Sequence, residues 1–189
     1  MPRSSNSEIH SANAVLQDFR EQIDDFMQFH PQSPIEEKQR ANFRGLAYYD
    51  HNPDLDLVVE VERFPESEPA IEMETSTGDR RTFRRYGSFD FDVGGERGRL
   101  TIYRDAEAGD YFLPFRDATS GNETYGAGRY LDNHRPGLKP LAGGKFEIDF
   151  NYAYNPYCAY SPCFSCPLPP RENWLKVPIH AGEKDFQVD

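Results

Sequence analysis

Apolar residues in the N-terminal part of the chain recur at alternating spacings of three and four. This spacing places them on one face of an α-helix, with polar residues on the opposite face. The positions are Ile9, Ala12, Leu16, Phe19, Ile23 and Phe26. The pattern ends at His30-Pro31, so we predict one long amphipathic helix whose apolar face covers the rest of the protein. A dimer seam is the alternative use of that face.

A second, short helix is predicted directly after the first. Ser33 has the side chain of a helix N-cap, Pro34 fits the first helical position, and Glu36 would complete a capping box. The helix is expected to end before Phe43.

From Gly45 onward the apolar spacing changes to two, which is typical of β-strands. The alternating stretches are 55–61, 89–93 with 100–102, 111–115 and 146–150, and Gly94-Gly95 favours a hairpin turn. Strands joined by short turns, with no helix between them, predict a mainly β protein, α+β at the margin. We expect an antiparallel meander that closes as a barrel or folds as a sandwich, beside the two helices.

The length of 189 residues suits one ordinary hydrophobic core, so we expect a single domain over residues 1–189. Residues 1–44 would form the helical segment and residues 45–189 the β domain on which it packs. Aromatic residues make up 14% of the chain, and we therefore expect a core built largely on Phe and Tyr.

The chain is strongly acidic and poor in lysine. It carries 32 acidic residues against 16 Arg and 5 Lys, and its formal net charge is −11. Such a surface suits concentrated salt, where screening removes the repulsion between like charges. We therefore expect a halophilic protein, with an ordinary acidic cytoplasmic protein as the alternative. The chain has no basic stripe to neutralise phosphates, which argues against nucleic-acid binding.

No stretch of the sequence has the length and apolar character of a membrane span, and residues 1–15 lack the apolar run of a signal peptide. We expect no membrane partner and a cytoplasmic location. A monomer or a weak homodimer is the expected assembly.

The three cysteines have the spacing C-x4-C-x2-C. This spacing matches three ligands of an iron–sulfur site, but no fourth cysteine exists, so a four-cysteine cluster within one chain is excluded. A zinc site formed by Cys158, Cys163 and Cys166, with His180 or His134 as the fourth ligand, stays open. Buried structural thiols and a cysteine nucleophile are the alternatives. No other cofactor is evident.

A second dense polar stretch covers residues 114–132. Asp117 and Thr119, just ahead of a glycine, are typical of a tight turn. Arg129 is able to clamp a carboxylate or phosphate of a ligand, or to pair internally with Asp117 or Asp149.

Several long strings make the chain resemble the family catalogued as domain of unknown function 1684. They include FRGLAYY, LPFRDATSGNETYGAGRYLD, IDFNYAYNPYCAY, SCPLPP and VPIHAGEK, and the resemblance extends from about Ser33 to Lys184. It implies no established activity. The positions that fit its pattern are Phe115, Asp117, Thr119, Gly121, Tyr125, Gly128, Arg129, Tyr130, Asp149, Asn151, Asn155, Cys158, Tyr160, Cys166 and Glu183. Cys163 departs from the pattern, and His134 and His180 do not belong to it.

Three hypotheses about function follow. The first is a pocket for a small polar or anionic ligand, built from segments 114–132 and 149–170, with Asp149 and Asn151 on one strand face. Its candidate residues are Asp117, Thr119, Tyr125, Arg129, Tyr130, Asp149, Asn151, Asn155 and Tyr160. The second is a hydrolase-like enzyme with Cys158 or Cys166 as nucleophile, or a carboxylate as base. The third is a structural or interaction protein, in which these side chains brace irregular backbone.

Overall fold

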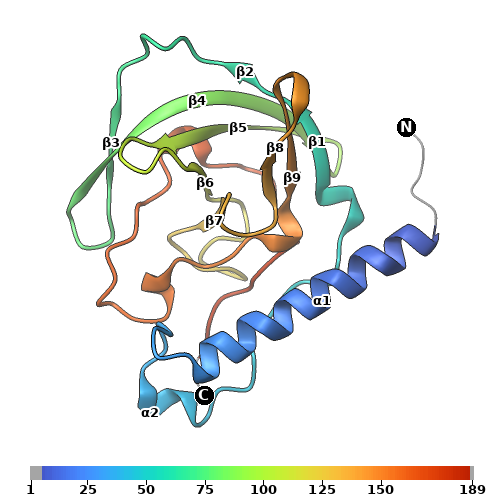
Figure 1. Ribbon diagram of the computed structural model, residues 1–189, viewed down its shortest axis with the longest axis vertical. Coiled ribbons are helices and arrows are strands. Elements are labelled where there is room, and N and C mark those ends of the chain that lie inside the picture. Colours follow the sequence, from blue (N-terminus) through green and yellow to red (C-terminus); the bar gives the residue numbers. More distant parts are fainter. Residues whose placement is uncertain (1–5, 188–189) are drawn as a thin grey trace.

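The computed structural model describes residues 6–187, and side chains from Ser11 onward. The side chain of Ile9, a position of the predicted helix, therefore lies outside the described part. So do the side chains of residues 1–10, the start of the stretch that lacks a signal peptide's apolar run. Two helices precede a β-rich body, and the C-terminal end of the described chain lies beside the second helix (Figure 1).

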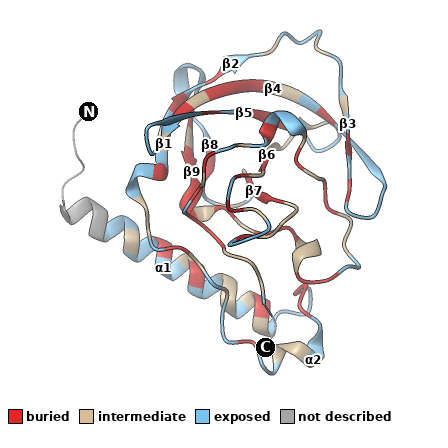
Figure 2. Cartoon of the chain, turned by 180° about the vertical axis from the view of Figure 1, so that it is seen from behind, coloured by how far each residue is buried: buried red, intermediate tan, exposed pale blue. Residues whose placement is uncertain are grey.

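The predicted long helix is α1 (Asn6–Phe29), which runs along one side of the molecule (Figure 1). Its inward face carries Leu16 and Met27, both fully buried, while Ala12 at the N-terminal end of the predicted stripe is exposed. The same face also buries Arg20, an inward charge that the apolar pattern did not indicate. Figure 2 shows buried and exposed positions alternating along the helix, as expected for a helix that covers a core on one side.

The second helix, α2 (Glu37–Arg40), is a single turn and begins later than predicted. Ser33 does not cap it, because its hydroxyl donates to the Met27 carbonyl at 2.6 Å and accepts from the Ile35 N–H at 3.2 Å. Glu36 occupies the N-cap position without a capping side-chain bond. The predicted capping box is therefore wrong, since the serine fixes the end of α1 instead.

The strands form two antiparallel sheets, with orders β1-β9-β8 and β2-β4-β5-β6-β7, and β3 pairs with β4 at the edge of the larger one. Their bounds are β1 Asp56–Glu60, β2 Glu62–Arg63, β3 Ile71–Glu74, β4 Arg80–Val93, β5 Glu96–Asp105, β6 Tyr111–Phe115, β7 Arg129–Asp132, β8 Leu138–Pro140 and β9 Lys145–Asp149. The run from β4 to β7 is the predicted meander.

The predicted hairpin joins β4 to β5, and its turn is Gly94-Gly95 with φ of 58° and 86°. Positive φ at both central residues is the requirement of a tight two-residue turn, which glycine meets without strain. The β4 strand bulges between Arg85 and Gly87. A Cβ at Gly87 would lie 2.7 Å from the Glu62 carbonyl oxygen, so this glycine allows β2 to approach β4 closely.

The main core lies between the two sheets. Phe146 and Ile148 of β9 pack with Phe89 of β4, Ile102 of β5 and Phe115 of β6, all of them buried. The expectation of an aromatic core is confirmed, as further ring contacts such as Phe91–Phe150 show. Figure 2 shows buried positions along β4, β5 and β9.

The prediction of a mainly β, antiparallel protein is confirmed. Of the two predicted arrangements, barrel and sandwich, the structure has the sandwich-like one. Among the strands of residues 6–187 no hydrogen-bonded pairing joins the β1-β9-β8 sheet to the larger one, so no barrel closes. The β1 strand pairs with β9 and not with the β4 edge, and this choice separates the sheets.

The chain after β9 is irregular and carries the short 3-10 helices η3 (Phe150–Tyr152), η4 (Tyr157–Ala159) and η5 (Arg171–Asn173); η1 (Pro53–Leu55) and η2 (Ala142–Gly144) lie earlier. Buried Asn173 joins this segment to the large sheet. Its amide donates to the carbonyls of Thr101 and Pro114, and its oxygen accepts from the Thr101 N–H, each at 2.8 Å. No helix in the described part of the chain is long and apolar enough to cross a membrane.

Candidate functional site

Arg129 and Asp117, two residues of the predicted ligand pocket, form a fully buried ion pair. Arg129 Nη2 lies 2.9 Å from Asp117 Oδ2, and its guanidinium also donates to the Ile179, Ala181 and Glu183 carbonyls. Thr119 donates its hydroxyl to Asp117 Oδ1 at 2.6 Å. Of the two internal partners considered for Arg129, the structure therefore selects Asp117, and the pair holds the C-terminal segment on β7.

Asn155 and Tyr160 meet at a different place, around the buried carboxyl of Glu183. The Tyr160 hydroxyl donates to Glu183 Oε2 at 2.6 Å, and the Asn155 N–H donates to the same oxygen at 2.8 Å. Burial raises the pKa of Glu183, while these donors and Arg135 oppose the rise. Around this carboxyl, Arg20 Nε, the Tyr48 hydroxyl and Asn155 Oδ1 are buried without a protein partner among the described residues.

Asp149 and Asn151 lie close together, but they do not lie on one face of the same strand. Asp149 ends β9, and Asn151 lies in η3, where its N–H and amide both donate to Asp149 Oδ1 at 2.9 and 2.7 Å. Asn151 also exchanges two hydrogen bonds with the backbone of Asn52. The prediction that both residues project from one strand face is therefore wrong, because the strand ends at Asp149 and a 3-10 turn follows.

The remaining predicted residues lie apart from these groups. The Tyr125 hydroxyl is 3.6 Å from Cys158 Sγ, and the Tyr130 hydroxyl donates to the Pro167 carbonyl. Tyr130 also lines a pocket of about 200 Å³ together with His134, whose Nε2 lies 2.8 Å from Asp110 Oδ2. The structure thus divides the nine predicted residues among several local clusters.

The zinc site considered from the cysteine spacing is not formed. No group of three or more His, Cys, Asp or Glu side chains that could hold a metal ion occurs among residues 6–187. Cys158 and Cys166 approach each other, but Cys163 is exposed. His180 instead packs on the Tyr49 ring and lies 3.6 Å from Glu123. The irregular backbone around the cysteines therefore gathers two thiols and no third ligand.

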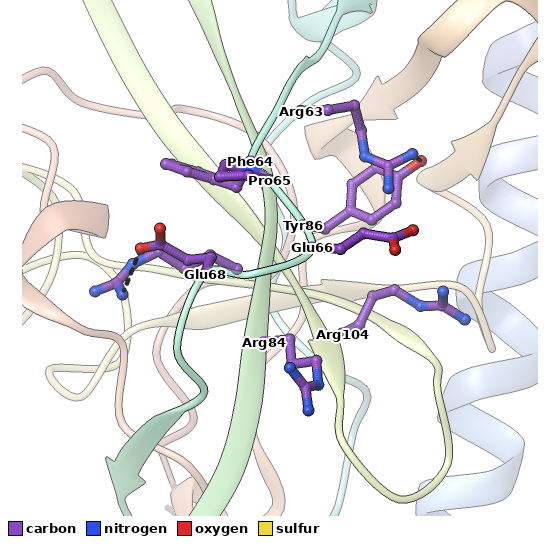
Figure 3. A pocket seen from close by; sticks show the side chains of 9 residues that line it. Arg63, Phe64, Pro65, Glu66, Glu68, Arg84, Tyr86 and Arg104 are labelled. Carbon is purple, nitrogen blue, oxygen red and sulfur yellow. Dashed lines mark hydrogen bonds and ion pairs between the residues drawn. The ribbon is translucent and has the colours of Figure 1, made fainter.

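The pocket that stands out for its chemistry lies elsewhere, where the segment that joins β2 to β3 crosses β4 (Figure 3). Its volume is about 420 Å³, within the range of small-molecule sites. Four arginines and two glutamates contribute its charges. The lining residues are Arg63, Phe64, Pro65, Glu66, Glu68, Arg84, Arg85, Tyr86 and Arg104.

Strand register brings two of these arginines together. Arg84 of β4 and Arg104 of β5 are directly opposed in the antiparallel pairing, so both side chains project from the same face. Like charges in this arrangement repel each other. An anion between them would convert the repulsion into attraction.

Arg63 joins the same surface from β2. Its guanidinium lies 3.8 Å from the centre of the Tyr86 ring, and it donates to the Tyr86 hydroxyl at 3.0 Å. The Tyr86 ring packs in turn on Phe146 of the core. In Figure 3 the side chains of Arg63, Tyr86, Glu66 and Arg104 lie on one side of β4.

The pocket arginines differ in their partners. Arg85 binds Glu172 at 2.8 Å and Glu68 at 3.6 Å. None of the ion pairs among the described residues involves Arg63, Arg84 or Arg104, although acids outnumber bases in the chain. These three guanidiniums thus have no counter-ion among the described residues, although Arg104 Nε donates to the Gly109 carbonyl at 2.9 Å, and their other N–H groups can meet an external anion.

The pattern of residues along the chain did not reveal this pocket. The string RRTFRRY, residues 80–86, carries four of the sixteen arginines in one strand, and that density was the available signal. Arg63 and Arg104 come from other strands, and their proximity depends on the fold.

Comparisons with known proteins give a family and one informative structure. Residues 41–184 match the family described as "Protein of unknown function (DUF1684)". A solution NMR structure of an uncharacterized protein from Haloarcula marismortui is 36% identical in sequence, with a TM-score of 0.69, over 95% of this chain and 97% of that one. No curated protein matches the chain.

Proposed function

The chain belongs to the DUF1684 family, whose description assigns no activity, and we propose that it binds a small organic anion in the arginine-lined pocket of β2, β4 and β5. The observation that carries this proposal is the direct opposition of Arg84 and Arg104, with Arg63 nearby, and no ion pair for any of the three among the described residues.

The chemistry of the lining narrows the ligand class. Guanidinium groups present planar pairs of donors that match the oxygens of carboxylate and phosphate. Three such groups favour a ligand with two or more negative charges. Tyr86, Phe64 and Pro65 add apolar surface, which suits an organic portion of the ligand.

Two glutamates limit the affinity and set the specificity of this site. Glu68 neutralises Arg85, so that arginine contributes less to an incoming anion. The Glu66 carboxylate also lines the pocket, and its negative charge repels an incoming anion. A ligand must therefore interact with the guanidiniums strongly enough to offset this repulsion.

Isothermal titration calorimetry with citrate and with pyrophosphate, at the lowest salt concentration at which the protein stays folded, tests the proposal. Arg84→Gln and Arg104→Gln should each weaken binding about tenfold or more, because a charge-assisted hydrogen bond contributes about 1.5–3 kcal/mol. Arg97→Gln is the matched control, since it removes the same charge from an exposed position on β5 that pairs with Asp90.

Equal affinity in all three variants would show that binding is not at this pocket, and no heat with either probe in the wild-type protein would reject both anion classes. Glu66→Gln gives an independent readout. It should strengthen binding several-fold by removing the repelling carboxylate.

We also propose that the protein works in the concentrated salt of a halophilic cytoplasm. Its excess of acids and its preference for arginine over lysine support this, as does a relative of 36% identity from a halophile. The melting temperature in molar and in dilute salt tests this point, as described below.

A further inference from the structure

Cys158 and Cys166 form a thiol pair that the anion pocket does not use. The Cys158 N–H donates to Cys166 Sγ at 3.3 Å, and neither residue is in a disulfide. Cys158 is partly accessible, while Cys166 is buried. Cys158 is therefore the residue of the pair that is more open to reagents from solvent.

The surroundings of the pair distinguish the two sulfurs. The Tyr125 hydroxyl lies 3.6 Å from Cys158 Sγ. A hydrogen bond from the Cys166 thiol lowers the pKa of Cys158 to about 6, burial opposes this, and the Tyr125 hydroxyl adds to it. The pKa of Cys166 is raised by its role as donor to Cys158. Cys158 is thus the more acidic thiol of the pair.

Cys166 is fixed in place by the turn between β3 and β4. Its N–H donates to Ser76 Oγ at 3.1 Å, and its carbonyl accepts from the Ser76 N–H at 2.9 Å. The neighbouring Ser165 hydroxyl donates to Thr75 Oγ1 at 2.9 Å. Cys158 comes from the separate turn η4, so a bond between the sulfurs would tie η4 to the β3–β4 turn.

We propose that Cys158 and Cys166 are a redox-active pair that a peroxide oxidises to a disulfide. In the first step the Cys158 thiolate attacks one peroxide oxygen, the O–O bond breaks, and the departing hydroxide takes a proton from the solvent to become water. Cys158 is then a sulfenic acid, oxidised by two electrons, and the peroxide is reduced.

The second step closes the disulfide. The Cys166 sulfur attacks the Cys158 sulfur, the S–O bond breaks, and the leaving hydroxide takes the Cys166 proton as a second water. The hydrogen bond from the Cys158 N–H to Cys166 Sγ stabilises the negative charge that develops on this sulfur as its proton leaves. Tyr125 acts as a positioning residue, because its hydroxyl holds negative charge on Cys158.

Hydrogen peroxide and a thiol count under denaturing conditions test the proposal in the wild-type protein. Alkylation followed by intact-protein mass spectrometry should find one free thiol after oxidation and three after reduction with dithiothreitol, and peptide mapping should join Cys158 to Cys166. Three free thiols after treatment, or oxidation at exposed Cys163 alone, would overturn the proposal.

Variants in a Cys163→Ser background separate the two roles. With Cys166→Ser added, dimedone should trap a sulfenic acid on Cys158, whereas with Cys158→Ser added Cys166 should stay unlabelled. The reverse labelling pattern would contradict the assignment.

The effect of Tyr125 has its own readout. Tyr125→Phe should move the pH midpoint of Cys158 alkylation by iodoacetamide upward from about 6 toward the ordinary thiol value. Tyr157→Phe is the matched control, because its ring packs on Phe164 in the same segment. An unchanged midpoint in Tyr125→Phe would remove this residue from the proposal.

Discussion

Arg129 Nη2 lies 2.9 Å from Asp117 Oδ2, and neither side chain is accessible to solvent. The two residues come from either end of the loop between β6 and β7. The Arg129 guanidinium also donates to three carbonyls of the C-terminal segment. One buried side chain therefore joins β7, the start of the β6–β7 loop and the C-terminal segment.

Removal of this guanidinium should destabilise the protein strongly. Arg129→Met leaves Asp117 as a buried charge without its counter-ion, and we expect the free energy of unfolding to fall by about 3–5 kcal/mol. Arg97→Met is the control, since its pair with Asp90 is exposed and worth about 0–1 kcal/mol. Urea denaturation of both variants measures the difference. Equal losses would mean that the buried pair contributes no more than a surface one.

Asp56 should make stability depend on pH. Loss of water around its carboxyl raises the pKa of Asp56 to about 6. The negative charge of Asp149, its register partner across β1 and β9, adds to the rise. A raised pKa means that the folded state binds the proton more tightly than the unfolded chain. The contribution to stability is therefore complete below the unfolded pKa, 3.8, and is lost as the pH rises through about 6.

Asp56→Asn removes this dependence. The variant should be more stable than the wild type by about 1 kcal/mol or less at about pH 8, because Asp56 is solvent-exposed, and the gain should disappear near pH 4. Denaturation midpoints at both pH values measure the change, with the exposed Asp54→Asn as control. A gain that is the same at both pH values would exclude Asp56 as its source.

Gly128 should not tolerate a side chain. It has a φ of 105°, and a Cβ there would lie 2.5 Å from the Phe115 carbonyl oxygen. We expect Gly128→Ala to lower the free energy of unfolding by about 3 kcal/mol, from backbone strain and overpacking together. Gly143→Ala is the matched control, with a φ of 74° but open space around it, and should cost about 1 kcal/mol. Equal thermal shifts in the two variants would contradict the role of the close contact.

Salt should stabilise the protein. With a net charge of −11, self-repulsion grows as screening is removed. Dialysis from molar potassium chloride to dilute buffer is expected to lower the melting temperature by several degrees, measured by circular dichroism. A melting temperature that stays constant would reject the halophilic interpretation.

The hydrophobic pattern by itself determined the long helix and the longer strands of this protein, because periodicity is a local property, but it did not indicate the short strands β2, β3, β7 and β8. The spacing of Leu16 and Ile23 indicated α1, alternation indicated β1, β6 and β9, and Gly94-Gly95 indicated the β4–β5 hairpin. Local signals failed where a side chain binds a distant group, as Ser33 does at Met27 instead of capping α2. They also gave no preference between barrel and sandwich, since that depends on which strand pairs with β1.

Only the tertiary structure decided which polar side chains meet. Arg129 faces Asp117, Cys158 faces Cys166, and Arg84 faces Arg104 because strand register and the course of the C-terminal segment bring them together. Composition supplied the residue types, but a one-residue shift in register would turn Arg104 to the other face of the sheet. The family strings marked Asp117, Arg129 and Glu183, whose contacts in the fold are internal, whereas the arginines of the open pocket became visible as a group only once β2, β4 and β5 were paired.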